Sequence, residues 1–227
     1  PVAGAAYTTA SGCILSPSIE AKKLGIKVGM RVKDGKTICP RLIILPTDPE
    51  KYRFINLKLT KLLSSYTSDF TIKSIDELVL NLARSPYIYK GIVALGQEIK
   101  AKIRERIGSF LCVSIGISTN FYLAKIASEL HKPDGLDVID KNNFMAVFEK
   151  LKLTDLCGIK EKNALRLNSA GIFTVKDFYE SGLQQKTSAF KSVNGYYWHL
   201  RLHGFEIDNI KSPQKTFGQS YALPRPT

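Results

Sequence analysis

Two adjacent carboxylates are the first residues in this sequence whose types could support chemistry. Asp76 and Glu77 follow Ser74-Ile75, at a point where the alternation of apolar and polar residues changes phase. Neighbouring side chains on a regular strand point to opposite faces, so an unbroken strand would leave the pair as a solvated edge. A bend or bulge there would let both carboxylates approach a divalent metal ion. Nucleotidyl transfer with two metal ions also needs an acid from a second strand, so the pair predicts only part of such a site.

A second candidate lies where an apolar segment leads into a helix. Residues 110–118 are typical of a buried strand, and a helix over residues 120–131 is predicted to start at Thr119 or Asn120. Lys125 lies within the first two turns of that helix, whose N-terminus could bind an anion. A plain strand-to-helix turn with a surface lysine also fits this pattern, so both interpretations stay open.

A third candidate is a turn between two short predicted helices. The turn carries Gly158-Ile159-Lys160, and the arrangement resembles a helix-hairpin-helix. Such a motif holds a DNA phosphate through backbone N–H groups, independently of base sequence. The usual pattern has a second glycine where Lys160 stands, so a plain helical corner remains the alternative.

The histidines and cysteines do not form the pattern of a metal site. His199 and His203 are spaced i, i+4 but lack a third ligand, so the neighbouring aromatic residues 196–198 are expected to pack a helix end. The four cysteines are far apart and include no C-x-x-C pair, which indicates free thiols in a reducing compartment. Cys112 is expected to be buried. The other three are Cys13, Cys39 and Cys157.

The elements that must position these residues alternate between helix and strand. Asp48-Pro49 is a typical helix start, with Asp48 as the N-cap. This order predicts an α+β domain, a sheet covered by helices, and the chain after Pro133 is mostly helical. Strands are expected over 42–45, 69–82, 110–118 and 136–139, and helices over 49–66, 91–107, 120–131, 142–151, 161–170, 174–181 and 188–203.

Composition narrows the classes of function. The 227 residues include 33 Lys plus Arg and 20 Asp plus Glu, which gives a net charge of +13 and a pI of about 9.6. This balance favours a partner that carries phosphates. The hydrophobic content of 44% excludes wholesale disorder, and no run approaches the ~20 apolar residues of a membrane span. The chain starts at Pro1 without a signal-like segment, so we expect an internal piece of a longer protein.

Taken together, these segments resemble a Y-family (translesion) DNA polymerase. The resemblance depends on several motifs that follow one another in the family's order over nearly the whole chain. They are Glu20–Met30, Cys39-Pro40 with Leu45-Pro46, Ser74–Glu77, Ser114–Ala127, Lys132–Gly135, Leu156–Ile159 and Lys215–Ser220.

The resemblance implies a domain layout and a reaction. Residues 1–48 would be part of the fingers, and 49–132 the palm without its first strand, a ferredoxin-like antiparallel sheet with helices. Residues 133–210 would be the helical thumb with the helix-hairpin-helix-like turn, and 211–227 a linker and the start of the little finger. The implied function is DNA-templated DNA synthesis across damaged template, as part of DNA repair, by two-metal nucleotidyl transfer.

The resemblance also assigns roles to single residues. Asp76 and Glu77 would be catalytic ligands of Mg²⁺, with two ions in the complete enzyme. Lys125 would contact the incoming triphosphate, and so would Lys22, which stands where the family usually has an arginine. The turn formed by Gly158, Ile159 and Lys160 would hold the DNA backbone.

Partners and location follow from the same resemblance. We expect primer-template DNA and deoxynucleoside triphosphates as partners, with a sliding clamp reached through regions outside this chain. We expect no membrane association. The protein is expected to be a cytoplasmic monomer, associated with the nucleoid if it is bacterial.

Departures from the family pattern leave room for other functions. The family's opening strand, with its Asp-x-Asp-x-aromatic stretch, is absent from the sequence, so the chain by itself is expected to be inactive or nearly so. Ile19 stands where many members have a triphosphate-binding tyrosine, and Asn81 where an aspartate is common. The alternatives are a non-catalytic DNA-binding relative of the polymerase, and a basic structural or protein-interaction module.

Overall fold

The computed structural model describes residues 1–208 and Gly218 and has the expected α+β composition. The chain divides into two compact units, and the border between Phe54 and Ile55 falls inside helix α3 (Pro49–Leu63). The predicted linker and little-finger start at 211–227 lie outside the described residues, apart from Gly218. Among the helices of the described part, none has both the length and the apolar character needed to cross a bilayer.

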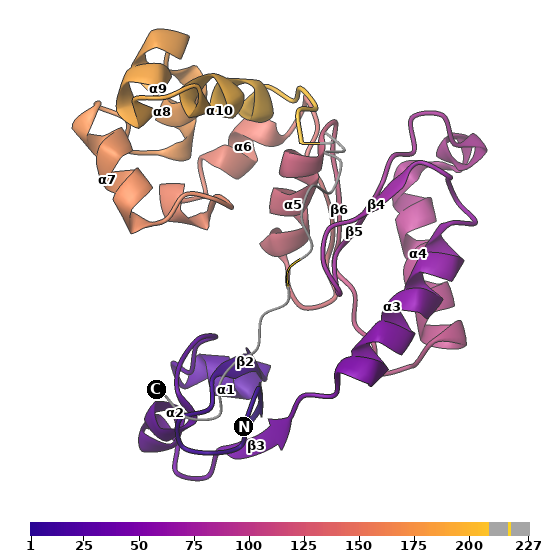
Figure 1. The fold of residues 1–227 in the computed structure, drawn as a ribbon. Helices are drawn as coiled ribbons and strands as arrows, with labels where there is room; N and C mark the ends of the chain where they lie inside the picture. Colours follow the sequence, from indigo (N-terminus) through magenta and orange to yellow (C-terminus); the bar gives the residue numbers. More distant parts are fainter. Residues whose placement is uncertain (209–217, 219–227) are drawn as a thin grey trace. The chain divides into compact units, whose positions relative to one another are not determined.

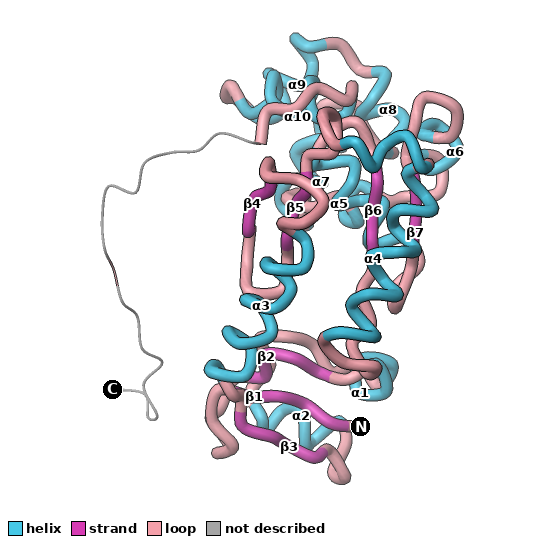
Figure 2. Tube along the Cα trace, turned by 90° about the vertical axis from the view of Figure 1, so that its right-hand side faces the viewer, coloured by secondary structure: helices cyan, strands magenta, loops and turns pink. Residues whose placement is uncertain are grey.

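The first unit contains a three-stranded sheet in the order β2-β1-β3 (Figure 2). Strand β1 (Val2–Ala5) pairs antiparallel with β2 (Ile14–Pro17) on one side and parallel with β3 (Ile43–Pro46) on the other. Helices α1 (Ile19–Lys23) and α2 (Val32–Ile38) complete the unit. We did not predict β1, because its alanines and glycine have low strand propensity and the strand depends on partners at both edges.

The strand expected at residues 42–45 exists, but it is not buried. Leu42, just before β3, is 4% exposed, whereas Ile43 and Leu45 are 57% and 52% exposed. The prediction of a buried strand was wrong because β3 lies at the edge of its sheet, next to β1 only. An apolar run alone does not distinguish an edge strand from a central one.

The second unit begins with a layered region. Strands β4 (Phe70–Ile72) and β5 (Leu78–Leu80) form an antiparallel pair, while β6 (Ile115–Ile117) and β7 (Leu136–Val138) pair in parallel. Helices α3 and α4 (Ile92–Arg106) cover one face of these strands, and α5 (Phe121–Leu130) covers the other (Figure 1). The 3₁₀-helix Pro86–Lys90 precedes α4. The antiparallel expectation holds for β4 and β5, and the parallel pairing of β6 and β7 was not predicted.

Two expected strands of this region are shorter than the sequence suggested. Residues 69–82 form a hairpin, so the phase change marks a full reversal of the chain and not a bend in one strand. The apolar run from Phe110 becomes a strand only at Ile115, and Phe110 is 98% exposed. Cys112 is also exposed, contrary to expectation. Leu111, Val113 and Ile115 pack against the core that α3 and α4 contribute to, and Cys112 between the first two is left outside it.

Close packing joins β6 to α5. A Cβ atom on Gly116 would lie 1.9 Å from the carbonyl oxygen of Ala124, which leaves no room for any side chain. The glycine therefore sets the distance between the strand and the helix that carries Lys125.

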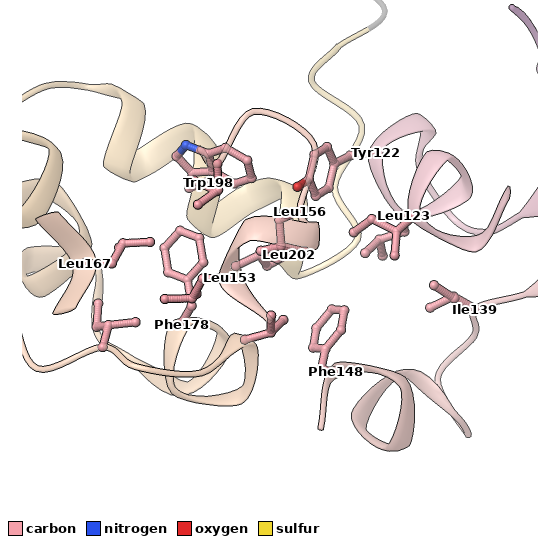
Figure 3. Packing of buried hydrophobic residues seen from close by; sticks show 14 of the residues in the cluster. Tyr122, Leu123, Ile139, Phe148, Leu153, Leu156, Leu167, Phe178, Trp198 and Leu202 are labelled. Atoms are coloured by element: carbon pink, nitrogen blue, oxygen red, sulfur yellow. The ribbon is translucent and has the colours of Figure 1, made fainter. Parts of the chain in front are cut away.

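The helical part of the second unit follows. The predicted helix over 188–203 is interrupted at Lys191, which adopts a left-handed conformation at φ 49° and ends α9. One large hydrophobic core connects these helices with α5 (Figure 3), and Phe148, Phe178 and Trp198 meet Tyr122 and Leu123 there. The elements are α6 (Phe144–Phe148), the 3₁₀-helix Leu153–Asp155, α7 (Glu161–Ser169), α8 (Val175–Glu180), α9 (Leu183–Phe190) and α10 (Asn194–Leu202).

Of the three aromatic residues 196–198 of α10, only Trp198 is buried in the core. Trp198 is 6% exposed, and its ring stacks on Phe190 at 6.2 Å between centroids. The packing role is therefore confirmed for Trp198, whereas Tyr196 and Tyr197 remain 43% and 38% exposed. All four cysteines are free thiols.

Candidate active site

The turn between β4 and β5 carries both candidate carboxylates (Figure 2). The backbone N–H of Lys73 donates to the carbonyl of Glu77 at 2.9 Å and closes the turn. Asn56 of α3, which is 9% exposed, donates its side-chain amide to the carbonyl of Ile75 at 2.9 Å. The turn is therefore fixed both within itself and to the helix behind it.

The two acids have different surroundings. Asp76 is exposed, and its carboxylate accepts a hydrogen bond from the Ser74 hydroxyl at 2.6 Å. The side chain of Glu77 is 30% exposed and accepts a hydrogen bond from Lys125 at 3.1 Å. The structure thus brings together Glu77 and Lys125, which are 48 residues apart in the sequence.

Lys125 is held between two carboxylates. Its ammonium group lies 3.1 Å from Glu77 and 3.3 Å from Glu129, one helical turn further along α5. Partial burial acts to lower the pKa of Lys125, but the hydrogen bonds and charges of Glu77 and Glu129 outweigh it and hold this pKa above its usual value. Lys125 is therefore a cation at any physiological pH, as a phosphate-binding group must be.

The N-terminus of α5 already has an anionic partner from this chain. Asn120 is the N-cap, and its side-chain oxygen accepts from the N–H of Leu123 at 2.8 Å. The N–H of Phe121 donates to the carboxylate of Glu206 at 2.7 Å. Sequence reasoning missed Glu206, because 85 residues separate it from Phe121 and no local pattern connects them. The predicted anion site at this terminus thus holds a side chain of the protein itself.

The acids of the turn suit a hard metal ion, since carboxylate oxygens are the ligands that Mg²⁺ prefers. Over residues 1–208 and Gly218, no group of three or more His, Cys, Asp or Glu side chains could hold a metal ion. The donor chemistry of Asp76 and Glu77 therefore fits Mg²⁺, but these described residues supply only a partial coordination shell.

The other predicted triphosphate contact lies in the first unit. Lys22 is exposed in the last turn of α1, whose N-cap Ser18 accepts from the N–H of Ala21 at 3.3 Å. Ile19, in the first turn of the same helix, is 46% exposed.

The predicted DNA-binding turn precedes α7. Gly158 has a φ of +91°, a conformation that favours glycine, and a Cβ there would lie 3.3 Å from the Trp198 ring. Ile159 is fully buried, and its N–H donates to Leu156 at 2.9 Å, so this amide is already paired. Lys160 is exposed at the start of α7.

A basic surface continues from this turn along α7. Lys160, Lys162 and Arg166 are all exposed and line one surface groove, together with the single acid Glu161. Tyr122 of α5 donates its hydroxyl to the carbonyl of Cys157 at 3.1 Å, which ties the turn to α5. Burial raises the pKa of Tyr122 well above its usual range, so this hydroxyl keeps its proton.

Comparison with known proteins places the chain in a family. A family model described as the impB/mucB/samB family matches residues 1–129. DNA polymerase IV of Saccharolobus solfataricus is 34% identical over 167 residues, which cover 74% of this chain and 47% of that protein. DNA polymerase IV of Ureaplasma parvum serovar 3 is 31% identical over 189 residues, 83% of this chain and 52% of that protein. The chain spans about half the length of these curated relatives.

Solved structures share the fold. A Y-family DNA polymerase chimera, Dbh-Dpo4(243-245)-Dbh, has a TM-score of 0.81 at 24% identity, covering 94% of this chain and 63% of the other. DinB from Sulfolobus solfataricus has a TM-score of 0.76 at 27% identity, covering 89% and 59%. The resemblance indicated by the sequence motifs is thus confirmed, and the chain belongs to the impB/mucB/samB family, of which the curated relatives matched here are described as DNA polymerase IV.

Proposed function

We propose that the protein containing this chain carries out DNA-templated DNA synthesis across damaged template. The observation that carries the proposal is the pairing of Glu77 with Lys125 at the turn of a two-stranded hairpin, in a chain of this family. An acid suited to a metal ion and a cation suited to a triphosphate are the two groups that nucleotidyl transfer must hold close together.

In this proposal each residue has a distinct task. Asp76 and Glu77 hold Mg²⁺, of which the complete enzyme uses two ions. The bound ions would supply charge neutralisation at the triphosphate and activation of the primer hydroxyl. Lys125 donates to phosphate oxygens and exchanges its carboxylate partner Glu77 for the nucleotide. Lys22 is the second triphosphate contact.

DNA binding is assigned to the thumb-like part of the second unit. Lys160 and the backbone around Gly158 contact a phosphate of the duplex, and the side chain of Ile159 anchors the turn from inside the core. We retain the layout of fingers at 1–48, palm at 49–132, thumb at 133–210 and linker at 211–227 as part of the proposal. A relative described as an insertion ternary complex of Dbh DNA polymerase, with a TM-score of 0.77 and 26% identity, supports DNA and nucleotide as partners.

The 227 residues alone are proposed to have little or no polymerase activity. Two-metal catalysis needs carboxylates that clamp both ions. Across the described stretches of the chain, Asp76 and Glu77 do not belong to any group of three metal-binding side chains. Primer extension by the purified 227-residue chain at the rate of a full-length relative would overturn this part of the proposal.

Substitutions of the two acids test the reaction. In the full-length protein, Asp76→Ala and Glu77→Ala should each lower primer extension by about a hundredfold or more, because a metal ligand is lost. DNA affinity, measured by fluorescence anisotropy, should stay within about twofold, since phosphate contacts lie elsewhere. Full activity of Glu77→Ala would refute the assignment of the metal site.

Lys132, just beyond the end of α5, is a matched control for Lys125 because both lysines pair with Glu129. Lys125→Ala should raise the KM for the incoming nucleotide by about tenfold, through loss of a charged hydrogen bond to phosphate. Lys132 also pairs with Glu129, at 2.6 Å, but no contact to Glu77 is observed in the described chain. Lys132→Ala should therefore leave the KM nearly unchanged. Equal effects of the two substitutions would contradict a triphosphate role for Lys125.

A non-catalytic DNA-binding relative is the second candidate function. The residues in its favour are Ile19, Asn81 and Lys160, which depart from the pattern that the resemblance implies. The two candidates differ in nucleotide binding, which should require Mg²⁺ in a polymerase. Isothermal titration of nucleotide with and without Mg²⁺ separates them, and metal-independent binding would favour the second candidate.

A further inference from the structure

We propose that Glu206 is a positioning residue for nucleotide binding. It acts by fixing the N-terminus of α5, the helix that carries Lys125, to the chain that leaves α10. This inference rests on the proposed role of Lys125. It concerns the segment Gly204–Asp208, called the strap below, which no sequence motif singled out.

The carboxylate of Glu206 supplies what α5 lacks in its own sequence. Acids near a helix N-terminus are stabilising because they face its unpaired N–H groups and positive dipole end. The first turn of α5 contains no acidic residue. Glu206 fills this place with one oxygen on the N–H of Phe121 at 2.7 Å. Its other oxygen accepts from the N–H of Asp208 at 2.7 Å, so both oxygens of the carboxylate are paired.

The N-cap residue of α5 adds one bond to α10 and one bond to the strap. Asn120 is 4% exposed, and its side-chain amide donates to the carbonyls of Arg201 and Phe205, at 2.9 Å each. The strap also passes very close to α5. Gly204 has a φ of +85°, and a Cβ there would lie 2.8 Å from the hydroxyl of Thr119. The end of α10 is therefore fastened to the start of α5 at several points.

The other end of the strap reaches the turn that carries the candidate acids. Asp208 accepts two hydrogen bonds from Arg201 Nε, at 2.8 and 3.1 Å, which fix its side chain to α10. Lys73 donates its ammonium group to the carbonyl of Asp208 at 2.9 Å and lies 4.6 Å from the centre of the Phe121 ring. Lys73 is also the residue whose backbone N–H closes the turn at Glu77.

These hydrogen bonds form a closed ring. It runs from Glu77 through the backbone of Lys73 to Asp208 and Glu206, enters α5 at Phe121, and returns from Lys125 to Glu77. A ring of hydrogen bonds restricts the relative positions of its members more than one pair can. Loss of Glu206 removes one of the bonds that hold the helix terminus, so the ammonium of Lys125 is placed less precisely relative to the acids.

The test compares Glu206→Ala with a matched acid on the same unit. Glu105 is exposed on α4, and Glu105→Ala removes the same charge away from the strap. In the full-length protein, Glu206→Ala should raise the KM for nucleotide by about five- to tenfold with a smaller change in kcat, as misplacement of a binding group does. DNA affinity should be unchanged in both variants. Equal KM values for Glu206→Ala and the native protein would overturn the inference.

A double-mutant cycle with Lys125→Ala shows whether Glu206 acts through Lys125. If it does, the KM of the double variant should equal that of Lys125→Ala, because residues that act through one another are not additive. If the increases in KM caused by the two single substitutions instead multiply in the double variant, the inference is overturned while the proposed function stays intact. An unchanged KM for Lys125→Ala would instead refute the proposed function, so the two failures are distinguishable.

A readout without catalysis completes the test. Hydrogen exchange at the Phe121 amide should be faster by about tenfold in Glu206→Ala, because its acceptor is lost, and unchanged in Glu105→Ala. If Glu206→Ala does not fold, Glu206→Gln carries the same test. Its amide offers one acceptor oxygen in place of two, so it should give an intermediate KM. A native KM together with native exchange in Glu206→Gln would overturn the inference.

Discussion

At the scale of single residues, the candidate site depends on which partner each polar group finds. Glu77 and Lys125 are paired across the unit, while Asp76 is held locally by Ser74. Asn81 shows the same dependence. Its side-chain amide donates to the carboxylate of Asp69 at 2.9 Å, one position beyond the β4–β5 ladder.

The Asn81–Asp69 pair gives a prediction about stability and pH. In Asn81→Asp two carboxylates would face each other, so the free energy of unfolding at pH 7 should fall by about 1 kcal/mol. Repulsion raises the pKa of the acid pair in the folded state above the unfolded value of about 4. The folded variant then binds more protons than the unfolded variant. The loss of free energy of unfolding relative to the native protein should therefore vanish below about pH 4 and grow as pH rises through the raised pKa.

The measurement is urea denaturation of both proteins between pH 3 and pH 8. Exchange of the two residues, Asp69→Asn with Asn81→Asp, restores one acid and one amide and is the control. It should recover most of the stability at pH 7. If Asn81→Asp loses the same free energy of unfolding at every pH, repulsion between the two carboxylates is not the cause.

At the scale of elements, turns decide where the functional groups lie. Glycine is required at Gly158 because its φ is +91° and because the Trp198 ring lies close to where a Cβ would be. This turn also leads to Lys160, which lies on the surface at the start of α7. This short segment therefore links the core of the helical part to its basic surface.

Gly158→Ala should lower the free energy of unfolding by about 1–3 kcal/mol, since it adds backbone strain at a positive φ and a tight contact. Gly108→Ala is the matched control. Gly108 lacks a positive φ, and a Cβ there would meet Leu111 at an ordinary 3.7 Å. In thermal unfolding, Gly108→Ala should be as stable as the native protein or slightly more stable. Equal stability of Gly158→Ala and the native protein would show that the turn tolerates a side chain.

At the scale of the whole molecule, charge determines the class of partner. The net charge of +13 belongs to the complete sequence. The structure concentrates part of it on α7, where Lys160, Lys162 and Arg166 lie together. Contacts to DNA phosphates release counterions, so affinity falls with rising salt in proportion to the number of contacts.

The combined substitution of Lys160, Lys162 and Arg166 by alanine should reduce the salt slope of DNA binding by up to about 3, with similar losses for all sequences. A triple substitution of the exposed Lys61, Arg84 and Arg106 removes the same charge elsewhere in the unit. It should change the slope much less. Fluorescence anisotropy at several salt concentrations measures both, and equal slopes for the two triple variants would contradict a specific DNA-binding role of α7.

The sequence by itself determined the fold class, the family and most of the helices after Pro49, but not α1 or α2 or the break between α9 and α10. Periodic apolar residues and caps are local signals, so α3, α4 and α5 appeared near their expected bounds, and Asp48 and Asn120 lie at the expected N-termini. The motif order indicated the family that the comparisons confirm. The sequence also selected Asp76, Glu77 and Lys125 as candidate site residues.

Only the tertiary structure decided how those residues meet. The pairing of Glu77 with Lys125 and the contact of Glu206 with Phe121 join positions 48 and 85 residues apart. The central strand β1 and the exposure of Ile43, Phe110 and Cys112 were likewise beyond prediction from the sequence. The physical reason is the same in each case. Propensity and periodicity act over a few residues, whereas burial, strand pairing and ion pairing depend on neighbours that folding alone brings into contact.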